Sequence, residues 1–280
     1  MDRREGSFEG RDGLWLHWRA WLPDGDPRAH VVISHGAGEH GDRYERLAER
    51  LVAEGFAVWA SDHRGHGHSE GPQGIVDRFR NAVADLDAVM DLASLERPGR
   101  RMFMLGHSMG GAIALDYALG RQDKLTGLIL SAPAAALDPD SAASRIAAKV
   151  LSELVPGLPV HELDTSGISR DPDEVRAYEE DPLIDRGRMR ARTVGELVNA
   201  FERFPEELPR LVLPMLVMHG TADRVTSPEC SRMIFERAGS ADKTIELYEG
   251  YYHELINEPH PDRERVLDRI ASWLDERAPT

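Results

Sequence analysis

The sequence predicts an α/β fold, in which a mostly parallel central sheet is flanked by helices and interrupted by a helical insertion. Two observations indicate this fold. Short apolar runs alternate with segments whose apolar residues recur at helical spacing, which is the pattern of parallel strands joined by crossover helices. The alternation stops between about residues 134 and 207 and then resumes. A chain of 280 residues fits one large α/β domain with such an insertion.

Two early segments are predicted to be antiparallel strands. Residues 14–21 are rich in aromatic side chains, as strands often are. Residues 30–34 are a short apolar run, which is typical of a strand buried on both faces. After them, apolar residues recur at helical spacing over residues 44–52, which predicts the first helix.

The next elements continue the alternation. Residues 57–60 and 102–105 are short apolar runs that predict buried strands, and an amphipathic helical pattern over residues 79–90 separates them. Residues 127–131 form the following predicted strand. Because a helical pattern lies between successive strands, we expect these strands to be parallel.

The insertion carries helical patterns and no convincing buried strand. Ile146, Val150, Leu154 and Val155 form an apolar stripe on one predicted helix, which residues 156–159 should stop because they contain two prolines and a glycine. We expect the stripe to pack on the rest of the protein; the alternative is that it docks on a lipid surface.

The strand and helix pattern resumes after the insertion. Residues 214–218 and 243–248 predict two further strands, and apolar residues over 266–274 predict a closing helix. We therefore expect a catalytic α/β domain made of residues 1–133 and 208–280, with residues 134–207 as a helical cap (lid) subdomain.

Composition narrows the function classes. The net charge of −15 argues against nucleic acid as a partner, because phosphate binding needs a concentrated basic surface. The single cysteine, Cys230, excludes an intrachain disulfide, and it lies in a helical stretch where a packing role is expected. The N-terminal residues lead into no apolar segment, and no apolar run reaches transmembrane length. We expect a cytoplasmic protein. The sequence does not determine its oligomeric state, and transient peripheral contact of the cap with a lipid surface is an open alternative.

The pentapeptide Gly106–Gly110 is the most informative motif. It has the pattern G-x-S-x-G, it follows an apolar run, and it precedes a small, apolar helical stretch. A serine at the apex of a sharp strand–turn–helix is the nucleophile elbow of α/β-hydrolases. The glycines permit the tight turn, and the helix N-terminus offers N–H groups to a developing negative charge. Ser108 is therefore the predicted nucleophile.

A serine nucleophile needs a base, and the base needs an orienting carboxylate. In α/β-hydrolases the chain order is serine, then acid, then histidine. Asp223 lies just after one late strand and His253 just after the next, so both lie at the edge of the sheet where Ser108 is expected. Asp223 is the predicted acid and His253 the predicted base. The alternative for Asp223 is a simple turn residue.

The oxyanion hole of such an enzyme needs two backbone N–H groups. One is expected from Met109, the residue after the nucleophile, and the other from Ala37 in the loop after an early strand. The alternative for that loop is a glycine-rich turn without a catalytic part. The histidine-rich loop 62–69 could suggest a metal site, but no carboxylate or cysteine ligand pattern accompanies it, so we expect a structural loop, no metal and no cofactor.

Several segments together resemble the monoacylglycerol lipases, particularly the bacterial ones. They are His35–His40 with Arg43 and Tyr44, the loop 62–69, Gly106–Gly111, Tyr252–Glu254, and the insertion segments 155–159, 168–172 and 178–183. The resemblance covers almost the whole chain. The insertion segments are its specific part, because the elbow and turn motifs alone would indicate only an α/β-hydrolase.

The resemblance implies a serine hydrolase that cleaves the ester bond of a monoacylglycerol to a free fatty acid and glycerol through an acyl-enzyme. It also implies an acyl tunnel under the cap and a polar pocket for the glycerol end, near which Glu39, Arg43 and Tyr178 match family positions. For these three residues the alternative is a helix N-terminal ion pair and a packed tyrosine. Rival functions are a broad-specificity carboxylesterase, a lysophospholipase, or a non-catalytic receptor on the same fold.

Overall fold

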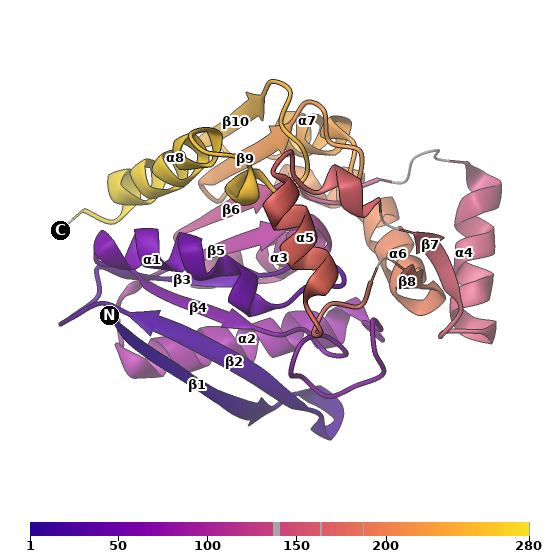
Figure 1. Cartoon of the computed structure of the whole chain (residues 1–280), viewed down its shortest axis with the longest axis horizontal. Helices are drawn as coiled ribbons and strands as arrows, with labels where there is room; N and C mark the ends of the chain where they lie inside the picture. Colours follow the sequence, from indigo (N-terminus) through magenta and orange to yellow (C-terminus); the bar gives the residue numbers. More distant parts are fainter. Residues whose placement is uncertain (137–140, 163, 187, 280) are drawn as a thin grey trace.

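An eight-stranded sheet forms the centre of the molecule in a computed structural model that describes all residues except 137–140, 163, 187 and 280 (Figure 1). The strand order is β1-β2-β4-β3-β5-β6-β9-β10. The strands are β1 (Asp2–Glu9), β2 (Trp15–Leu22), β3 (Ala29–Ser34), β4 (Ala57–Ser61), β5 (Arg101–His107), β6 (Gly127–Ser131), β9 (Met215–Gly220) and β10 (Lys243–Tyr248).

All strands from β4 to β10 in this order run parallel, while β2 is antiparallel to both β1 and β4. The antiparallel prediction is thus correct for residues 14–21 and wrong for residues 30–34, because β3 pairs in parallel with β4 and with β5. The sequence analysis also missed β1. Its side chains are mostly charged and exposed, as suits an edge strand protected against pairing with other chains.

Helices cover both faces of the sheet. On one face, α1 (Glu45–Ala53) and α8 (Asp262–Arg277) pack against apolar side chains such as Val31 and Ile33. On the other, α2 (Phe79–Glu96), α3 (Ser108–Arg121) and α7 (Pro228–Arg237) pack against side chains such as Val32 and Met104. Consecutive residues of β3 therefore enter opposite halves of the core, which explains why the strand is an uninterrupted apolar run.

The predicted cap, residues 134–207, connects the neighbouring parallel strands β6 and β9 and is called the insert below. Its described elements are α4 (Ala142–Leu154), β7 (Pro159–Glu162), α5 (Pro172–Glu180), β8 (Arg188–Arg190) and α6 (Ala191–Glu207). In Figure 1, α4, α6 and the two short strands lie together at one end of the sheet. The strands β7 and β8 form a small exposed antiparallel pair, which the sequence analysis missed.

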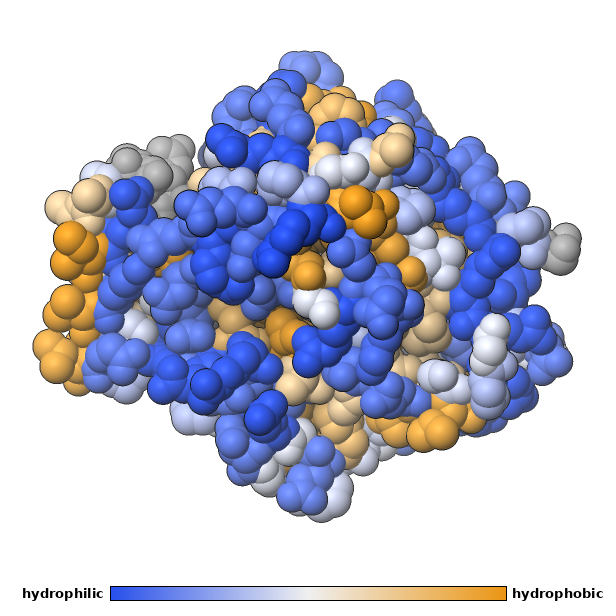
Figure 2. Space-filling view, turned by 180° about the vertical axis from the view of Figure 1, so that it is seen from behind, coloured by the Kyte–Doolittle hydropathy of each residue, from blue (hydrophilic) through white to orange (hydrophobic). Residues whose placement is uncertain are grey.

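The apolar stripe of α4 is exposed, which makes the expectation that it packs on the rest of the protein wrong. The exposed fractions are 63% for Ile146, 49% for Val150 and 75% for Leu154. Figure 2 shows apolar side chains gathered along the edge of the molecule that α4 forms. The helix is held through its other side, where Gly195 of α6 lies directly against Ser152. The predicted stop of the helix before residues 156–159 is correct.

None of the helices in the described ranges has the length and apolar character needed to cross a bilayer.

Candidate active site

Ser108 lies at the sharp turn between β5 and α3. Its backbone φ is +53°, a left-handed conformation that is strained for a residue with a side chain and is typical of a nucleophile elbow. The turn is possible because α3 approaches the end of β3 closely: a Cβ on Gly110 would collide with the carbonyl groups of Ser34 and His35. As the first residue of α3, Ser108 also lies at the positive end of the helix dipole.

Asp223 and His253 lie in the loops after β9 and β10 and contact each other. The Nδ1 atom of His253 is 2.7 Å from Oδ2 of Asp223. The other carboxylate oxygen, Oδ1, accepts hydrogen bonds from the backbone N–H groups of Val225 (2.7 Å) and Thr226 (3.0 Å). These two bonds fix the carboxylate, and the carboxylate in turn fixes Nδ1–H of His253 as a donor. The Nε2 atom is then left as the acceptor that a general base needs.

The charges of this pair stabilise each other. Burial alone would raise the pKa of Asp223, but the interaction with His253 and hydrogen bonds from His219 and His253 outweigh it and hold that pKa below its usual range. Burial alone would lower the pKa of His253, but attraction to Asp223 and the hydrogen bond between them raise it above 6.5. Glu254 and Glu39 add smaller contributions in the same direction.

The raised pKa of His253 predicts how activity depends on pH. A general base must be neutral, so kcat/KM should fall on acidification through an apparent pKa above about 6.5. Burial lowers the pKa of His35 to about 3 and that of His107 to about 4, so these two neighbours do not titrate in the same range. The measurement is kcat/KM for a water-soluble ester from pH 5 to 9 at constant ionic strength. A flat profile from pH 5 to 8 would contradict a histidine base.

The two predicted oxyanion donors lie beside Ser108. Met109 is in the first turn of α3, where N–H groups have no intrahelical acceptor. Ala37 lies in the loop after β3, and its N–H makes no hydrogen bond to any residue in the described part of the chain. The loop touches the nucleophile, since a Cβ on Gly36 would lie 3.2 Å from Cβ of Ser108. Ala37, Met109 and Ser108 line one cavity.

Glu39 and Arg43 belong to a buried network of hydrogen bonds and charges. Oε1 of Glu39 accepts from the Gly36 N–H (2.5 Å) and from the Tyr44 hydroxyl (2.7 Å), and Oε2 accepts from Arg43 (3.0 Å). Arg43 also makes a bidentate pair with Glu254, at 2.5 and 2.8 Å. Burial would raise the pKa of Glu39, but Arg43 and the other partners lower it overall.

The three predicted substrate-binding residues differ in their placement. Glu39 and Tyr178 line a small pocket of about 20 Å³ together with Ser108 and His253. Arg43 does not line that pocket: it lies behind Glu39, with its guanidinium 4.8 Å from the ring centroid of Tyr178. For Arg43 the structure therefore favours the ion-pair alternative. Removing it would leave two carboxylates buried, at a cost of about 3–5 kcal/mol in the free energy of unfolding.

Some residues of the site were not singled out from the sequence. Thr226 donates its hydroxyl to Oδ2 of Asp223 (3.1 Å), and its Oγ1 lies 3.3 Å from Nδ1 of His253. Glu254 was noticed only as part of a motif, although its carboxylate holds Arg43. The Asp-x-x-Thr spacing was an available signal for Thr226, since an aspartate often accepts from backbone N–H groups two and three residues later in a turn.

A larger cavity extends from Ser108 into the insert. Its volume is about 400 Å³. Its walls include Ala147, Ala148 and Leu151 of α4 and Leu197 and Phe201 of α6. Most of the residues that line it are apolar, whereas the small pocket carries the polar side chains of Glu39, Tyr178 and His253.

The histidines of loop 62–69 make hydrogen bonds within the protein. His63 contacts the Ser34 hydroxyl at 3.0 Å, and Nδ1 of His66 donates to the Arg64 carbonyl at 3.0 Å. Among the described residues, no group of three or more histidine, cysteine and acidic side chains could hold a metal ion.

The fold, with a strained serine at the turn between β5 and α3, defines the class: an α/β-hydrolase. Comparison with known proteins agrees. The sequence profile of the serine aminopeptidase S33 family matches residues 25–260. The chain is 38% identical over 273 residues to a monoacylglycerol lipase from Mycolicibacterium smegmatis, covering 97% of each chain. It is 40% identical over 271 residues to human monoglyceride lipase, covering 96% of this chain and 89% of the human one.

A crystal structure of a monoacylglycerol lipase from Paleococcus ferrophilus matches with a TM-score of 0.82 and 35% identity, over 99% of this chain and all of the other. The chain therefore belongs to the monoacylglycerol lipase family within the S33 group. The resemblance found in the sequence and the α/β-hydrolase fold are confirmed.

Proposed function

We propose that this chain is a monoacylglycerol lipase that hydrolyses its substrate to a free fatty acid and glycerol. Ser108 lines both a cavity of about 400 Å³ that reaches into the insert and a small pocket that carries Glu39 and Tyr178, and this observation carries the proposal. The residues that line the cavity are mostly apolar, as a long acyl chain requires. An ester of such a chain with a small polyol would place its carbonyl at Ser108 and direct a polyol hydroxyl toward Glu39 and Tyr178. The family relatives support the same substrate class.

The proposed mechanism is a two-step acyl transfer. His253 removes the proton from Ser108 Oγ as that oxygen attacks the ester carbonyl. The N–H groups of Ala37 and Met109 stabilise the resulting oxyanion. His253 then protonates the departing glycerol oxygen, activates a water molecule, and so releases the fatty acid from the acyl-enzyme. Asp223 orients the imidazole and stabilises its charged form.

Glu39 and Tyr178 are the proposed binding residues for the glycerol end. The Tyr178 hydroxyl has no hydrogen-bond partner among the described residues and its side chain lines the small pocket, so it is free to bind a substrate hydroxyl. Glu39 is buried and, because its pKa is lowered, stays ionised; its Oε2 atom accepts one hydrogen bond from Arg43 and can accept another. Arg43 has the indirect role of holding Glu39 and stacking on Tyr178.

The insert is proposed to be a cap over the active site. Part of it is fastened to the loops that carry the site: the backbone N–H of Glu254 donates to the Ile168 carbonyl at 2.7 Å, and that of Asp185 donates to the Gly38 carbonyl at 3.1 Å. The insert as a whole, including residues of α4 and α6, supplies most of the walls of the larger cavity. The acyl chain would thus be enclosed between the insert and the α/β domain.

The decisive experiment is steady-state hydrolysis of a series of monoacylglycerols of increasing chain length. A diacylglycerol, a triacylglycerol, a lysophospholipid and short simple esters serve as comparisons, and each is measured with the wild type and Ser108→Ala. Serine-dependent turnover that favours monoacylglycerols is expected. Equal turnover of all short esters would indicate a carboxylesterase. A preference for the lysophospholipid would indicate a lysophospholipase, and the absence of any turnover would indicate a non-catalytic receptor.

We also propose that the exposed stripe of α4 contacts a lipid surface transiently. The two sides of this helix differ in their roles: Ala147, Ala148 and Leu151 line the acyl cavity, while Ile146 and Leu154 face solvent. Val160 of β7 is 37% exposed and also lines the cavity, so an apolar side chain reaches from the surface to the cavity wall. A substrate that resides in lipid could pass along such a surface without crossing water.

Replacing Leu154 with glutamate should weaken this contact. Burying one leucine contributes about 1.5–3 kcal/mol, so binding to zwitterionic vesicles should fall about tenfold or more while hydrolysis of a short water-soluble ester stays unchanged. Leu95 on α2 is 76% exposed and is the matched control for a Leu→Glu change away from the stripe. Co-sedimentation with vesicles measures binding. Equal binding of the wild type and Leu154→Glu would remove the docking proposal.

A further inference from the structure

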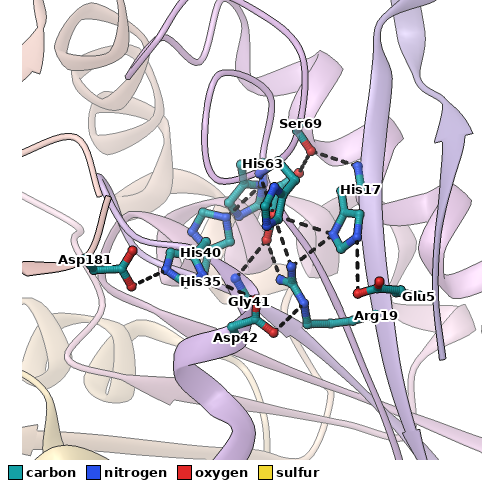
Figure 3. Close-up of polar contacts among 12 residues, drawn as sticks. Glu5, His17, Arg19, His35, His40, Gly41, Asp42, His63, Ser69 and Asp181 are labelled. Carbon is teal, nitrogen blue, oxygen red and sulfur yellow. Dashed lines mark hydrogen bonds and ion pairs between the residues drawn. The ribbon is translucent and has the colours of Figure 1, made fainter. Parts of the chain in front are cut away.

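Several buried histidines lie near the active site, and they have different partners. Figure 3 shows one group, in which His35 is bonded to the loop after β4 and His40 to Asp181 of the insert. These contacts join loops and the insert to one another. His219 lies elsewhere, near the end of β9, and contacts the proposed catalytic acid, Asp223, which follows it by four residues.

The position of His219 in β9 explains its burial. Side chains alternate between the two faces of a strand, so His219 lies on the same face as Val217, which packs in the half of the core that contains α7. There its Nδ1 atom is 2.7 Å from the hydroxyl oxygen of Ser231 on α7. The chain turns directly after the strand, where the N–H of Asp223 donates to the Gly220 carbonyl at 3.2 Å. This turn places Asp223 beside the imidazole.

The contacts of the His219 ring define its proton position. Nε2 is 3.0 Å from Oδ2 of Asp223 and 3.2 Å from the Thr226 carbonyl oxygen, and both oxygens can only accept, so Nε2 carries a proton. Nδ1 can accept from the Ser231 hydroxyl, so a neutral ring with its proton on Nε2 satisfies every contact. The side chains of His219 and Asp223 are fully buried, which strengthens the interaction between them.

Oδ2 of Asp223 is therefore shared between several donors. Nδ1 of His253 is 2.7 Å from it, Nε2 of His219 is 3.0 Å from it, and the Thr226 hydroxyl donates to it at 3.1 Å. Burial would raise the pKa of Asp223, but attraction to His253 and the hydrogen bond from His219 are among the causes that lower it. The charge of this carboxylate is thus divided between His253 and other donors.

We propose that His219 is a positioning residue of the catalytic acid, which holds Oδ2 of Asp223 with its Nε2–H and reduces the negative charge that acts on His253. The first effect keeps the oxygen in place for Nδ1–H of His253. The second makes the carboxylate a weaker base, so the imidazole keeps its Nδ1 proton and stays neutral to a lower pH. This inference rests on the proposed acyl transfer at Ser108 and adds a residue that sets the pH range of its base.

Other ionisable groups also face the His253 ring, and the tests below leave them unchanged. Glu254 and Glu39, the latter from the loop after β3, add smaller upward contributions to the pKa of His253. The ring of His107, at the end of β5, is 4.6 Å away between centroids, and burial lowers its own pKa to about 4. Burial raises the pKa of Tyr178, which the insert contributes to the same pocket. A difference between variants therefore reports the substituted side chain.

The experiment uses two substitutions that keep different parts of the contacts of His219. In His219→Gln the amide nitrogen takes the place of Nε2 and can still donate to Asp223, while the contact with Ser231 is lost. In His219→Asn the shorter amide can still reach Ser231 but cannot donate to Asp223. Each variant loses one buried hydrogen bond, so each is the control for structural damage in the other. Thermal unfolding verifies that both are folded.

NMR titration of labelled histidine measures the pKa of His253 without substrate. In His219→Asn we expect this pKa to rise by about 0.5–1 unit, because a carboxylate with one donor fewer attracts the imidazolium more strongly. In His219→Gln it should stay within about 0.2 units of the wild-type value, because the donor is retained.

The kinetics should follow the same order. A higher pKa leaves more of the base protonated at a given pH, so the acid side of the kcat/KM profile should move to higher pH in His219→Asn by the same amount as the pKa of His253. On the plateau of this profile, kcat should fall about threefold to tenfold in His219→Asn and less than about twofold in His219→Gln, with KM within about twofold in both.

A further test uses the wild-type protein, so it does not depend on whether a variant folds. Nitrogen-15 NMR distinguishes the two neutral tautomers of a histidine ring, and we expect the Nε2–H tautomer for His219 at pH 8. The Nδ1–H tautomer would overturn the proposal, because it would direct a lone pair instead of a donor at Asp223.

Equal pKa shifts in the two variants, or no shift in His219→Asn, would overturn the role of His219 and leave the proposed function intact. Absence of turnover in the wild type would instead overturn the proposed function, while the NMR titration would still measure the pKa of His253. The two failures are therefore distinguishable.

Discussion

Replacing Ser108 with alanine is expected to lower kcat for a monoacylglycerol by about 10⁴-fold or more, with little change in KM. The substitution removes the attacking oxygen and leaves both pockets and both oxyanion donors in place. A small residual rate above the uncatalysed one should remain, since binding and oxyanion stabilisation do not require the serine oxygen. The measurement is steady-state kinetics with a chain-length series.

The fold of this variant should be unaffected. Alanine has the same steric restrictions as serine at a φ of +53°, so the strain of the turn stays the same. Ser272 on α8 is exposed and lines neither pocket, so Ser272→Ala is the matched control and should keep full activity. Activity of Ser108→Ala close to that of the wild type would contradict the assignment of the nucleophile.

The placement of the candidate site residues was predictable because they follow strands. The strands that carry Ser108, Asp223 and His253 are parallel neighbours or near neighbours in the sheet, so their carboxyl ends meet at one edge. The strands before Ser108 and Asp223 are apolar runs, and the one before His253 alternates polar and apolar residues, so each can be found in the sequence. Chain order then selected one acid and one base from many candidates, and the structure brings these two into contact at 2.7 Å.

Pairing partners were less predictable than the elements themselves. An apolar run such as residues 30–34 indicates burial on two faces, but it contains no information on the direction of its neighbours, and β3 is parallel to both. The ion pair of Arg43 with Glu254 joins residues 211 positions apart, and a single sequence gives no signal for such a pair. The edge strand β1 was missed because charged, exposed side chains hide its strand character.

The apolar stripe on α4 shows a different limit of prediction from sequence: the pattern does not reveal what covers a helix face. Ile146, Val150 and Leu154 recur with the spacing of one helix face, and this pattern is the same whether the face is covered by protein or exposed to solvent. The small residues Ala147 and Ala148 on the other side of the helix were not predicted to have a role, although they line the larger cavity. Apolar periodicity predicts a face, whereas its partner depends on the tertiary structure.

Replacing Asp223 with asparagine is expected to be nearly as damaging as removing the serine. In the wild type, Oδ1 of Asp223 accepts from the N–H groups of Val225 and Thr226, and Oδ2 faces Nδ1 of His253. The asparagine oxygen must occupy the Oδ1 position, because only an oxygen can accept from two N–H groups. Its NH₂ group is then directed at Nδ1 of His253, where a donor meets a donor.

The imidazole can relieve this conflict only by moving its proton from Nδ1 to Nε2, and a His253 protonated on Nε2 cannot accept the proton of Ser108. We therefore expect kcat to fall about 10³–10⁴-fold with KM nearly unchanged. Asp268→Asn, an exposed change on α8, is the control and should leave kcat unaltered. Nitrogen-15 NMR of Asp223→Asn should show the changed tautomer of His253 directly. Retention of more than about a tenth of wild-type kcat would mean that the carboxylate charge and the tautomer it selects are not what makes His253 a base.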